Sequence, residues 1–542
     1  MAVAKSKRTK KQKLGQFLTP RKLSKKILNS YEFNIDDKIL EPSFGKGSFL
    51  FPLIDKLLRF HENKKEGLDY IFSNNIYGVE YDLEFYESFF AEVKEKYNYE
   101  IKKHNLYQSD FFLVNFDLQF NYIIGNPPFG GTFDKKIETK LDKKYGKRFG
   151  KKIKKETYSF FVVACCELLA PEGTLSFICS DTFRTINTMS GLRNFLLKKH
   201  NKVYKLSHFS EETDYGMVLL EHKNITSDIV VLDNKEYNKK DLYCFPNITF
   251  SPRPDVIKYF LGKLLSEYIT CTSGMTVGKN KLFIREINDS HIIETYDFDF
   301  FNDPITLRKE LEKAKNNKMS DRKKKETIQR EKNKETKRNI KITKKLSPIK
   351  IKIPNKDYVY YNKSTKGILY AKPAHVIYWK DNGDAVYTFK KNGKWYLHGV
   401  GGKPHFFKSG FTWSLISSKI KPRFLPSGYV FDSGAPVGVL KEKIDENELY
   451  FIIGWLSTMK STDILKTCLN HTRNIQSKDI ERLPYPFWVS DENKTIAVAK
   501  VKNAIENKMK DKPIGDLFFD EIENLYEFVQ TKDIKAKKTL DK

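Results

Sequence analysis

The sequence predicts an α/β protein organised around a mostly parallel sheet in its first half. Two observations lead to this prediction. Short apolar strands alternate with helices between residues 15 and 225, and glycine turns or polar side chains follow those strands at their carboxyl ends. From Lys350 to Val439 the chain is rich in Tyr, Trp, Lys and Gly, which favours a mixed, mostly β second domain, and C-terminal helices are expected after it.

The charge balance indicates a polyanionic partner. The 542 residues include 97 Lys and Arg against 68 Asp and Glu, a formal net charge of +29. This surplus favours nucleic acid, bound through counterion release, although a lysine-rich proteome would give the same composition. An aromatic content of 14% excludes a disordered basic protein.

The cysteines and the apolar stretches favour a cytoplasmic protein that does not enter a membrane. The six cysteines form no CxxC pair, so we expect reduced core residues rather than metal ligands or disulfides. The most apolar stretch, residues 160–179, is interrupted by Glu167 and by Pro171, which predicts a helix and a strand rather than a membrane span. Residues 1–14 are basic without an apolar core, which predicts a solvated tail and no secretory signal.

The first expected element is a helix from Arg21 to Ser30. Thr19 fits its N-cap and Pro20 its first turn. A loop that enters a helix in this way is either an ordinary helix start or a cradle for an anion or carboxylate.

A strand ending at Leu40 then leads through Glu41-Pro42-Ser43-Phe44-Gly45-Lys46-Gly47 into a helix over residues 48–58. Gly45 and Gly47 allow the backbone to approach a ligand closely. The acidic Glu41 would repel a pyrophosphate and suits a ligand with an amino group.

Two further strands end in acidic residues. Glu80 closes a strand over residues 76–80, where an acid can hold a ribose diol by two hydrogen bonds. A helix from Leu83 to Tyr97 follows. Asp110 then stands at the next strand end, where it can accept from an adenine amino group while Phe111 or Phe112 covers the ring.

The fourth strand, residues 120–125, runs into Asn126-Pro127-Pro128-Phe129. Two prolines cannot continue a strand, so the chain must leave the sheet here. The Asn126 amide oxygen and the Pro127 carbonyl can both accept from one planar amino group, and Phe129 can stack on the attached ring. Taken alone, the motif is equally compatible with a simple Pro-Pro turn.

These motifs, in this order, resemble the S-adenosylmethionine-dependent DNA adenine-N6 methyltransferases of the gamma class. The motifs that carry the resemblance are GQFLTP (residues 15–20), LEPSFGKGSF (40–49), GVE (78–80), DFF (110–112) and NPPF (126–129). Two departures are Phe44 and Lys46, where the family more often has small residues, and Phe129, where it more often has Tyr or Trp.

The resemblance implies a Rossmann-like, seven-stranded methyltransferase sheet that binds S-adenosylmethionine and acts on a flipped adenine in double-stranded DNA, without a metal. Asn126, Pro127, Pro128 and Phe129 would be catalytic. Cofactor contacts would come from Thr19, Pro20, Glu41, Pro42, Gly45, Gly47, Glu80, Asp110 and Phe111. The last strands, over residues 203–209 and 216–222, would place Phe209 or Tyr215 against the target base, though each is more often a plain strand-end aromatic. A cognate restriction endonuclease acting separately is a further implied partner.

The expected domains are a basic tail (1–14), the methyltransferase domain (15–235), a linker (236–265), a target-recognition domain (266–490) and C-terminal helices (491–542). Residues 274–280 and 474–486 resemble the two ends of the family's recognition domain. A Lys-rich insertion near 309–345 has too few apolar residues for a core, which predicts a solvated helix or a disordered segment.

Two other classes of function stay open. The same NPPF geometry suits an RNA base or a glutamine side chain, which would make the chain an RNA or protein-glutamine methyltransferase. The second class is a non-catalytic DNA-specificity subunit that kept the fold.

Overall fold

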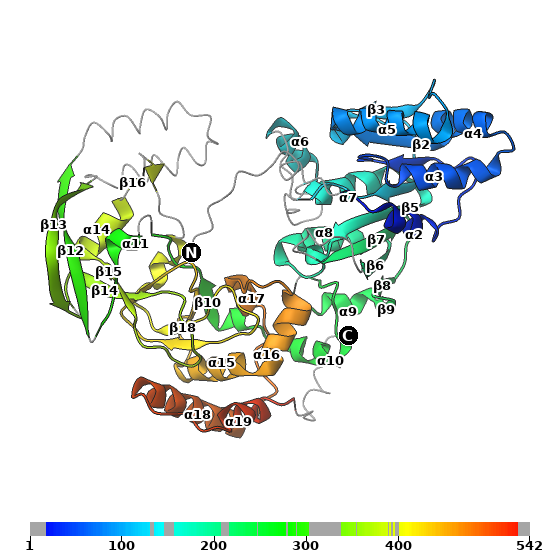
Figure 1. The fold of residues 1–542 in the computed structure, drawn as a ribbon. Helices are drawn as coiled ribbons and strands as arrows, with labels where there is room; N and C mark the ends of the chain where they lie inside the picture. The colour runs from blue at the N-terminus through cyan, green and yellow to red at the C-terminus, as the bar shows by residue number, and fades with distance from the viewer. Residues whose placement is uncertain are drawn as a thin grey trace. The chain divides into compact units, whose positions relative to one another are not determined.

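The computed structural model divides into two compact units (Figure 1). It describes residues 18–129, 135–145, 157–206, 216–246, 248–277, 280–288, 290–302, 338–353, 355–388, 390–391, 394–395 and 400–528. Unit 1 runs to Lys258 and includes Thr467–His471, and unit 2 holds the remaining residues from Tyr259 onward. The division at residue 258 falls inside the segment expected to be a linker.

A nine-stranded sheet forms the centre of unit 1, in the order β3-β2-β1-β4-β5-β7-β6-β8-β9. Its strands are β1 (Ile39–Glu41), β2 (Ile76–Glu80), β3 (Asn105–Gln108), β4 (Phe120–Gly125), β5 (Leu169–Ser180), β6 (His200–Leu206), β7 (Met217–Lys223), β8 (Ile229–Leu232) and β9 (Lys235–Asn238). All neighbours from β3 to β5 are parallel, whereas β7 is antiparallel to both β5 and β6. The predicted α/β class is confirmed.

The sheet has two strands more than the seven expected. β8 and β9 form a hairpin at its edge, joined by Asp233 and Asn234, which both have positive φ (50° and 64°). Two consecutive positive φ values are typical of the type I′ turn, whose twist matches that of the paired strands. The expected linker therefore begins within this hairpin, and its first residues belong to the sheet.

Helices cover both faces of the sheet. One apolar core joins the sheet to α2 (Arg21–Leu28), α3 (Leu50–Leu57), α4 (Lys64–Tyr70) and α5 (Leu83–Tyr97). A second core joins the opposite face to α6 (Lys135–Tyr145), α7 (Thr157–Glu167) and α8 (Ser190–Leu196). Alternate residues of one strand enter different cores, as Ile39 and Leu40 do in β1. Unit 1 therefore has three layers, with the sheet between two layers of helices, and a ligand can bind at the ends of the strands.

The start of α2 differs from the expectation. Its N-cap is Pro20, without a side-chain capping bond, and not Thr19. The Thr19 hydroxyl oxygen instead accepts a hydrogen bond from the Asn126 amide at 3.1 Å.

Unit 2 contains two small sheets and a group of helices. One sheet has the order β10 (Ile269–Thr272), β21 (Val437–Leu440), β18 (Gly410–Thr412) and β19 (Arg423–Leu425). The other has the order β11 (Ile284–Glu286), β15 (His375–Tyr378), β14 (Tyr358–Asn362) and β20 (Tyr429–Phe431). Short helices are α11 (Asn280–Phe283) and α14 (Lys380–Thr388) in unit 2, and α9 (Lys239–Tyr243) and α10 (Pro254–Ile257) in unit 1.

Two hairpins extend from this part of unit 2. β12 (His291–Asn302) pairs with β13 (Arg338–Lys352), and β16 (Lys390–Lys391) pairs with β17 (Lys394–Trp395). Because β13 begins at Arg338, residues 338–345 of the Lys-rich insertion form a strand, contrary to the expected solvated helix or disordered segment. The backbone of these residues pairs with β12. Residues 309–337 lie outside the described part of the chain.

The remaining helices of unit 2 lie in its C-terminal part. They are α15 (Asn447–Ser457), α16 (Met459–Ile464), α17 (Ser477–Glu481), α18 (Asp491–Met509) and α19 (Phe518–Leu525). An aromatic cluster joins α15 to the segments before α18 and after α19. Trp455, Trp488 and Tyr526 contact one another, and the Trp488 indole donates to the Tyr526 carbonyl at 2.9 Å. The Glu481 carboxylate accepts from the Cys271 backbone, which joins β10, directly before residues 274–280, to the segment 474–486.

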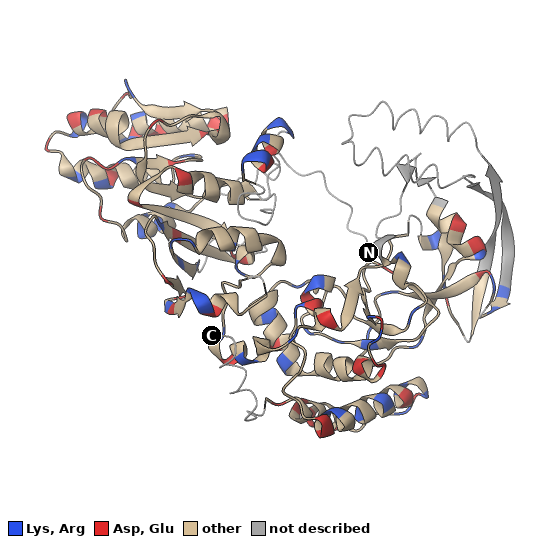
Figure 2. Ribbon diagram, turned by 180° about the vertical axis from the view of Figure 1, so that it is seen from behind, with Lys and Arg blue, Asp and Glu red and all other residues tan. Residues whose placement is uncertain are grey.

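Basic residues are spread through both units and occupy much of α6 (Figure 2). Among the described residues, no helix combines the length and apolarity that crossing a membrane requires.

Candidate active site

The turn after β1 is built around two buried carboxylates. Glu80, 5% exposed, accepts from the backbone N–H of Gly45 and of Asp82, both at 2.7 Å. These bonds tie the glycine turn to the end of β2. Burial raises the pKa of Glu80, and the two N–H bonds oppose that rise.

Glu41, 4% exposed, has no such support. Its Oε2 atom has no hydrogen-bond partner among the described residues. Burial and the nearby Glu80 charge raise the pKa of Glu41 well above its ordinary value. A buried carboxyl oxygen without a hydrogen-bond partner is suited to a ligand with a positively charged hydrogen-bond donor.

The glycines of this turn are required by its geometry. Gly47 has φ +76°, and a Cβ atom there would lie 2.4 Å from the Phe89 ring. Phe44 is buried below the turn and packs on Phe89, while Lys46 is exposed over Phe85. The two bulky departures from the family pattern therefore point away from the turn's backbone. Pro42 is buried beside the end of β4.

Asp110 lies at the end of the next strand, half-buried. Its carboxylate accepts from the Phe112 backbone at 2.9 Å, and burial raises its pKa. The Phe111 ring is only 6% exposed, since it stacks on Phe161 with centroids 5.0 Å apart. Phe111 contributes to the core of this region, and its role toward a cofactor stays a prediction.

Asn126 follows β4 directly, and β4 pairs with β1 on one side and β5 on the other. The bond from Asn126 Nδ2 to Thr19 Oγ1 fixes the amide plane, so its oxygen is an acceptor on the other side. The Ser43 hydroxyl donates to the Asn126 carbonyl at 3.4 Å. Pro127 is buried, Pro128 is partly exposed, and Phe129 meets Tyr158 edge to face at 5.9 Å.

The topology therefore brings Glu41, Glu80, Asp110 and Asn126 to one edge of four adjacent parallel strands. Phe209 and Tyr215, expected to contact a target base, lie outside the described residues.

Residues 53–214 match the Eco57I restriction-modification methylase family. The Type II methyltransferase M.BstVI of Geobacillus stearothermophilus is 32% identical over 218 residues, which cover 36% of this chain and 38% of that protein. The Type II methyltransferase M.PaeR7I of Pseudomonas aeruginosa is 29% identical over 182 residues, 31% of each chain. The matched stretch thus spans less than two fifths of either relative.

Solved structures share the fold at low sequence identity. A nuclease-deletion mutant of the Type ISP restriction-modification enzyme LlaGI, in complex with a DNA substrate mimic, superposes with a TM-score of 0.55 and 12% identity. The match covers 90% of this chain and 46% of that one. The Type IIL restriction-modification enzyme MmeI, in complex with DNA, gives 0.52 and 11%, over 96% of this chain and 74% of that one.

Two features at the same edge escaped sequence reasoning. Tyr81 follows Glu80, and its ring is 60% exposed. The sequence signal that could have identified Tyr81 is its position directly after Glu80, the acidic residue that ends β2. The second feature joins His471 to the end of β5: His471 Nε2 lies 3.1 Å from Asp181 Oδ1, and Nδ1 lies 2.8 Å from Thr185 Oγ1. No sequence spacing could predict a contact across 290 residues.

Proposed function

We propose that the chain is the modification methyltransferase of a restriction-modification system, which transfers a methyl group from S-adenosylmethionine to N6 of a flipped adenine in double-stranded DNA. The main support is the convergence of Glu41, Glu80, Asp110 and Asn126 at one sheet edge. The match of residues 53–214 to restriction-modification methylases and the net charge of +29 support it further.

The hydrogen-bond acceptors at this edge suit this cofactor. The Glu41 oxygen without a partner would accept from the amino group, Glu80 from the ribose hydroxyls and Asp110 from the adenine amino group. The exposed Tyr81 ring would cover the adenine. When bound, S-adenosylmethionine supplies an activated methyl group on a sulfonium.

The NPPF segment would prepare the amino group to be methylated. The lone pair of N6 is delocalised into the adenine ring, so this nitrogen is a weak nucleophile. The Asn126 amide oxygen and the Pro127 carbonyl would accept its two hydrogens and draw the lone pair back onto nitrogen. The amide held by Thr19 needs no reorientation during the reaction. Phe129, supported by Tyr158, would stack on the base once it has left the duplex.

The proposal is tested by expressing the chain in a host that lacks adenine methylation and mapping modified bases over the genome by single-molecule sequencing. We expect N6-methyladenine at one short motif and none with the Asn126→Ala variant. Methylated cytosine at a motif would contradict the adenine assignment.

The absence of modified bases would contradict the DNA assignment if the purified protein still binds S-adenosylmethionine. RNA or protein glutamine would then be the substrate to test. Loss of cofactor binding as well would favour a non-catalytic specificity subunit.

A further inference from the structure

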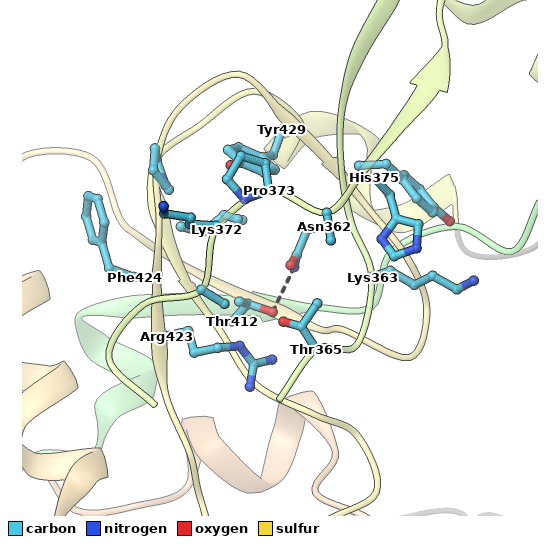
Figure 3. A pocket seen from close by; sticks show the side chains of 15 residues that line it. Asn362, Lys363, Thr365, Lys372, Pro373, His375, Thr412, Arg423, Phe424 and Tyr429 are labelled. Atoms are coloured by element: carbon cyan, nitrogen blue, oxygen red, sulfur yellow. Dashed lines mark hydrogen bonds between the residues drawn. The ribbon is translucent and has the colours of Figure 1, made fainter. Parts of the chain in front are cut away.

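Four loop segments of unit 2 are joined where several of its strands end. They are residues 363–367 after β14, 414–421 between β18 and β19, 432–435 between β20 and β21, and 472–476 before α17. Asn362 Nδ2 donates to Thr412 Oγ1 at 2.9 Å, which holds the ends of β14 and β18 together (Figure 3). The Leu415 N–H donates to the Gly434 carbonyl at 3.1 Å. The four segments are named the loop surface below.

Backbone hydrogen bonds fix the position of residues 414–417. The Ile475 N–H donates to the Leu415 carbonyl at 2.7 Å, and the Ser417 N–H donates to the Arg473 carbonyl at 3.0 Å. Beneath them the fully buried Trp413 donates from its indole to the Ile475 carbonyl at 2.9 Å. This loop is therefore held as firmly as a short strand pair.

Ile416 lies between these bonds and is 71% exposed, the largest exposed fraction of any large apolar residue in the described part of the chain. Its backbone pairs with that of Asn474. Single exposed apolar residues are common on proteins. Ile416 differs because the surrounding bonds would have to break before its side chain could reach a core.

The loop surface carries exposed positive charge and no exposed negative charge. Its exposed cations are Lys366, Lys419, Lys421 and Arg473. Asp432 is the one acidic residue in the four segments, and its carboxylate accepts from the Gly434 N–H at 2.7 Å and from the Tyr361 hydroxyl at 2.8 Å. Asp479, which follows the last segment, is buried and paired with Arg482. Such a surface favours a polyanion.

The apolar residue among these cations restricts the kind of polyanion. Phosphates are strongly hydrated, so an isoleucine side chain gains nothing from contact with them. It gains where it covers sugar and base edges that are flanked by charge. The grooves of a DNA duplex have this arrangement, since each lies between two rows of phosphates.

We infer that the loop surface binds a DNA duplex, with its exposed cations at the phosphates and Ile416 in a groove between the two phosphate rows. The identification of the polyanion as DNA rests on the proposed function. These contacts would set the position of the duplex on unit 2.

The first test measures binding of the full-length protein to a duplex of about 30 base pairs, without cofactor. We expect Arg473→Ala and Lys419→Ala each to weaken binding about 3- to 10-fold for any sequence and to reduce the salt slope by about one. Lys441→Ala is the control, because it removes an exposed lysine of unit 2 whose neighbours Glu442 and Asp445 are exposed acids. Its affinity and salt slope should match the wild type. Equal effects of all three variants would mean that net charge alone binds DNA, and would overturn the inference.

The second test changes the charge at Ile416. We expect Ile416→Glu to weaken binding at least about 10-fold through repulsion of the phosphates, and Ile416→Lys to bind at least as tightly as the wild type. Both variants lose the same apolar side chain, so a difference between them reports nearby phosphate and not folding. Ile496→Glu, at a residue of α18 that is 38% exposed, is the control and should bind as the wild type does. Equal affinities of Ile416→Glu and Ile416→Lys would contradict the place of Ile416 in a groove.

These results separate the inference from the proposed function. A wild type that binds the duplex, with loop-surface variants that bind equally well, would overturn the inference alone. A wild type that binds no duplex would overturn both. Neither test requires methyl transfer, so failure of the proposed reaction would leave the binding results intact.

Discussion

Glu41 sets the electrostatic character of the candidate site at the scale of single residues. Its buried carboxylate lies near the equally buried Glu80, and one of its oxygens has no described partner. In the free protein, a proton on Glu41 removes the unfavourable buried negative charge. In the complex, the ammonium group of a ligand would compensate that charge instead. Under the proposed function, folding stability and cofactor binding would therefore depend on the Glu41 carboxyl in opposite ways.

We expect Glu41→Gln to stabilise the free protein at pH 7–8 and to abolish cofactor binding. The raised pKa means that the unfolded chain loses the Glu41 proton at a lower pH than the native protein, so stability falls as pH rises from about 4.3 through the native pKa. The variant lacks this loss, and its melting temperature at neutral pH should be higher by about 2 °C or more. Melting curves between pH 4 and 8, with and without S-adenosylmethionine, check this. Glu62→Gln, an exposed control, should behave as the wild type, and retained cofactor binding by Glu41→Gln would contradict the assignment.

Tyr81 and Phe111 are alternative covers for an adenine ring, and they differ in burial. Tyr81→Ala removes a ring that is 60% exposed, so stability should change by no more than about 0.5 kcal/mol, while cofactor binding should weaken by about 1–3 kcal/mol. Phe111→Ala should destabilise the fold by about 3–5 kcal/mol through loss of core packing. Calorimetric titration with S-adenosylmethionine and thermal melts separate the two. Normal cofactor affinity in Tyr81→Ala would indicate that Phe111, and not Tyr81, covers the adenine ring.

Asn126 should affect the reaction far more than it affects binding. Asn126→Ala removes one of two proposed acceptors, and we expect the methylation rate to fall at least about 100-fold with DNA affinity unchanged. Single-turnover methylation and a DNA-binding titration measure the two effects. Asn115→Ala, on an exposed loop of the same unit, is the control. A parallel loss of DNA affinity would indicate a role in binding instead of chemistry.

At the scale of elements, an ion pair holds the β8–β9 turn to the body of unit 1. Arg184, 5% exposed, donates to both oxygens of Asp233, at 3.2 and 2.6 Å. Burial alone would raise the pKa of Asp233, but the bonds and charge of Arg184, with a smaller contribution from Lys205, outweigh it and lower that pKa. The pair therefore stabilises the fold above the ordinary pKa of aspartate, and this contribution is lost as pH falls through the lowered value.

We expect Asp233→Ala to destabilise unit 1 by about 2 kcal/mol, because Arg184 is buried but the Asp233 side chain is 41% exposed to screening solvent. Asp255→Ala is the matched control. It breaks an Arg–Asp pair with the same 2.6 Å contact, formed with Arg253, but on the surface, where the loss should stay below about 1 kcal/mol. Urea unfolding of both variants gives the two values, and equal losses would show that burial of Arg184 is unimportant.

The elements that the sequence predicted correctly are those determined by local signals. The helix from Leu83 to Tyr97 has the predicted bounds, and Glu41, Glu80 and Asn126 stand at strand ends as expected. The errors concern partners distant in the chain. Thr19 has a side chain suited to capping a helix, but its hydroxyl accepts a hydrogen bond from Asn126 instead. The Asp233–Asn234 turn alone is weak evidence for a hairpin, because the hairpin also depends on the pairing of β8 with β6. The packing of Phe111 on Phe161 and the contact of His471 with Asp181 arise only from the folded arrangement.

At the scale of the whole molecule, the two units have separate apolar cores. We expect calorimetry of the full chain to show two unfolding transitions, since each core can melt without the other. S-adenosylmethionine should raise only the transition of unit 1, by an amount that follows ligand concentration. Glu41→Gln should remove that shift while both transitions persist. A single transition that shifts as a whole would contradict independent units.

The short segment Thr467–His471 belongs to unit 1 although unit 2 precedes and follows it in the chain. It supplies the histidine that contacts Asp181 and Thr185 at the end of β5. No single cut can therefore separate the gene into two complete folding modules. A fragment ending at Lys258 lacks His471, and an exchange of unit 2 between relatives must keep the recipient's own version of this five-residue segment. Modular engineering of the chain has to treat the segment as part of the recipient, not of the donor.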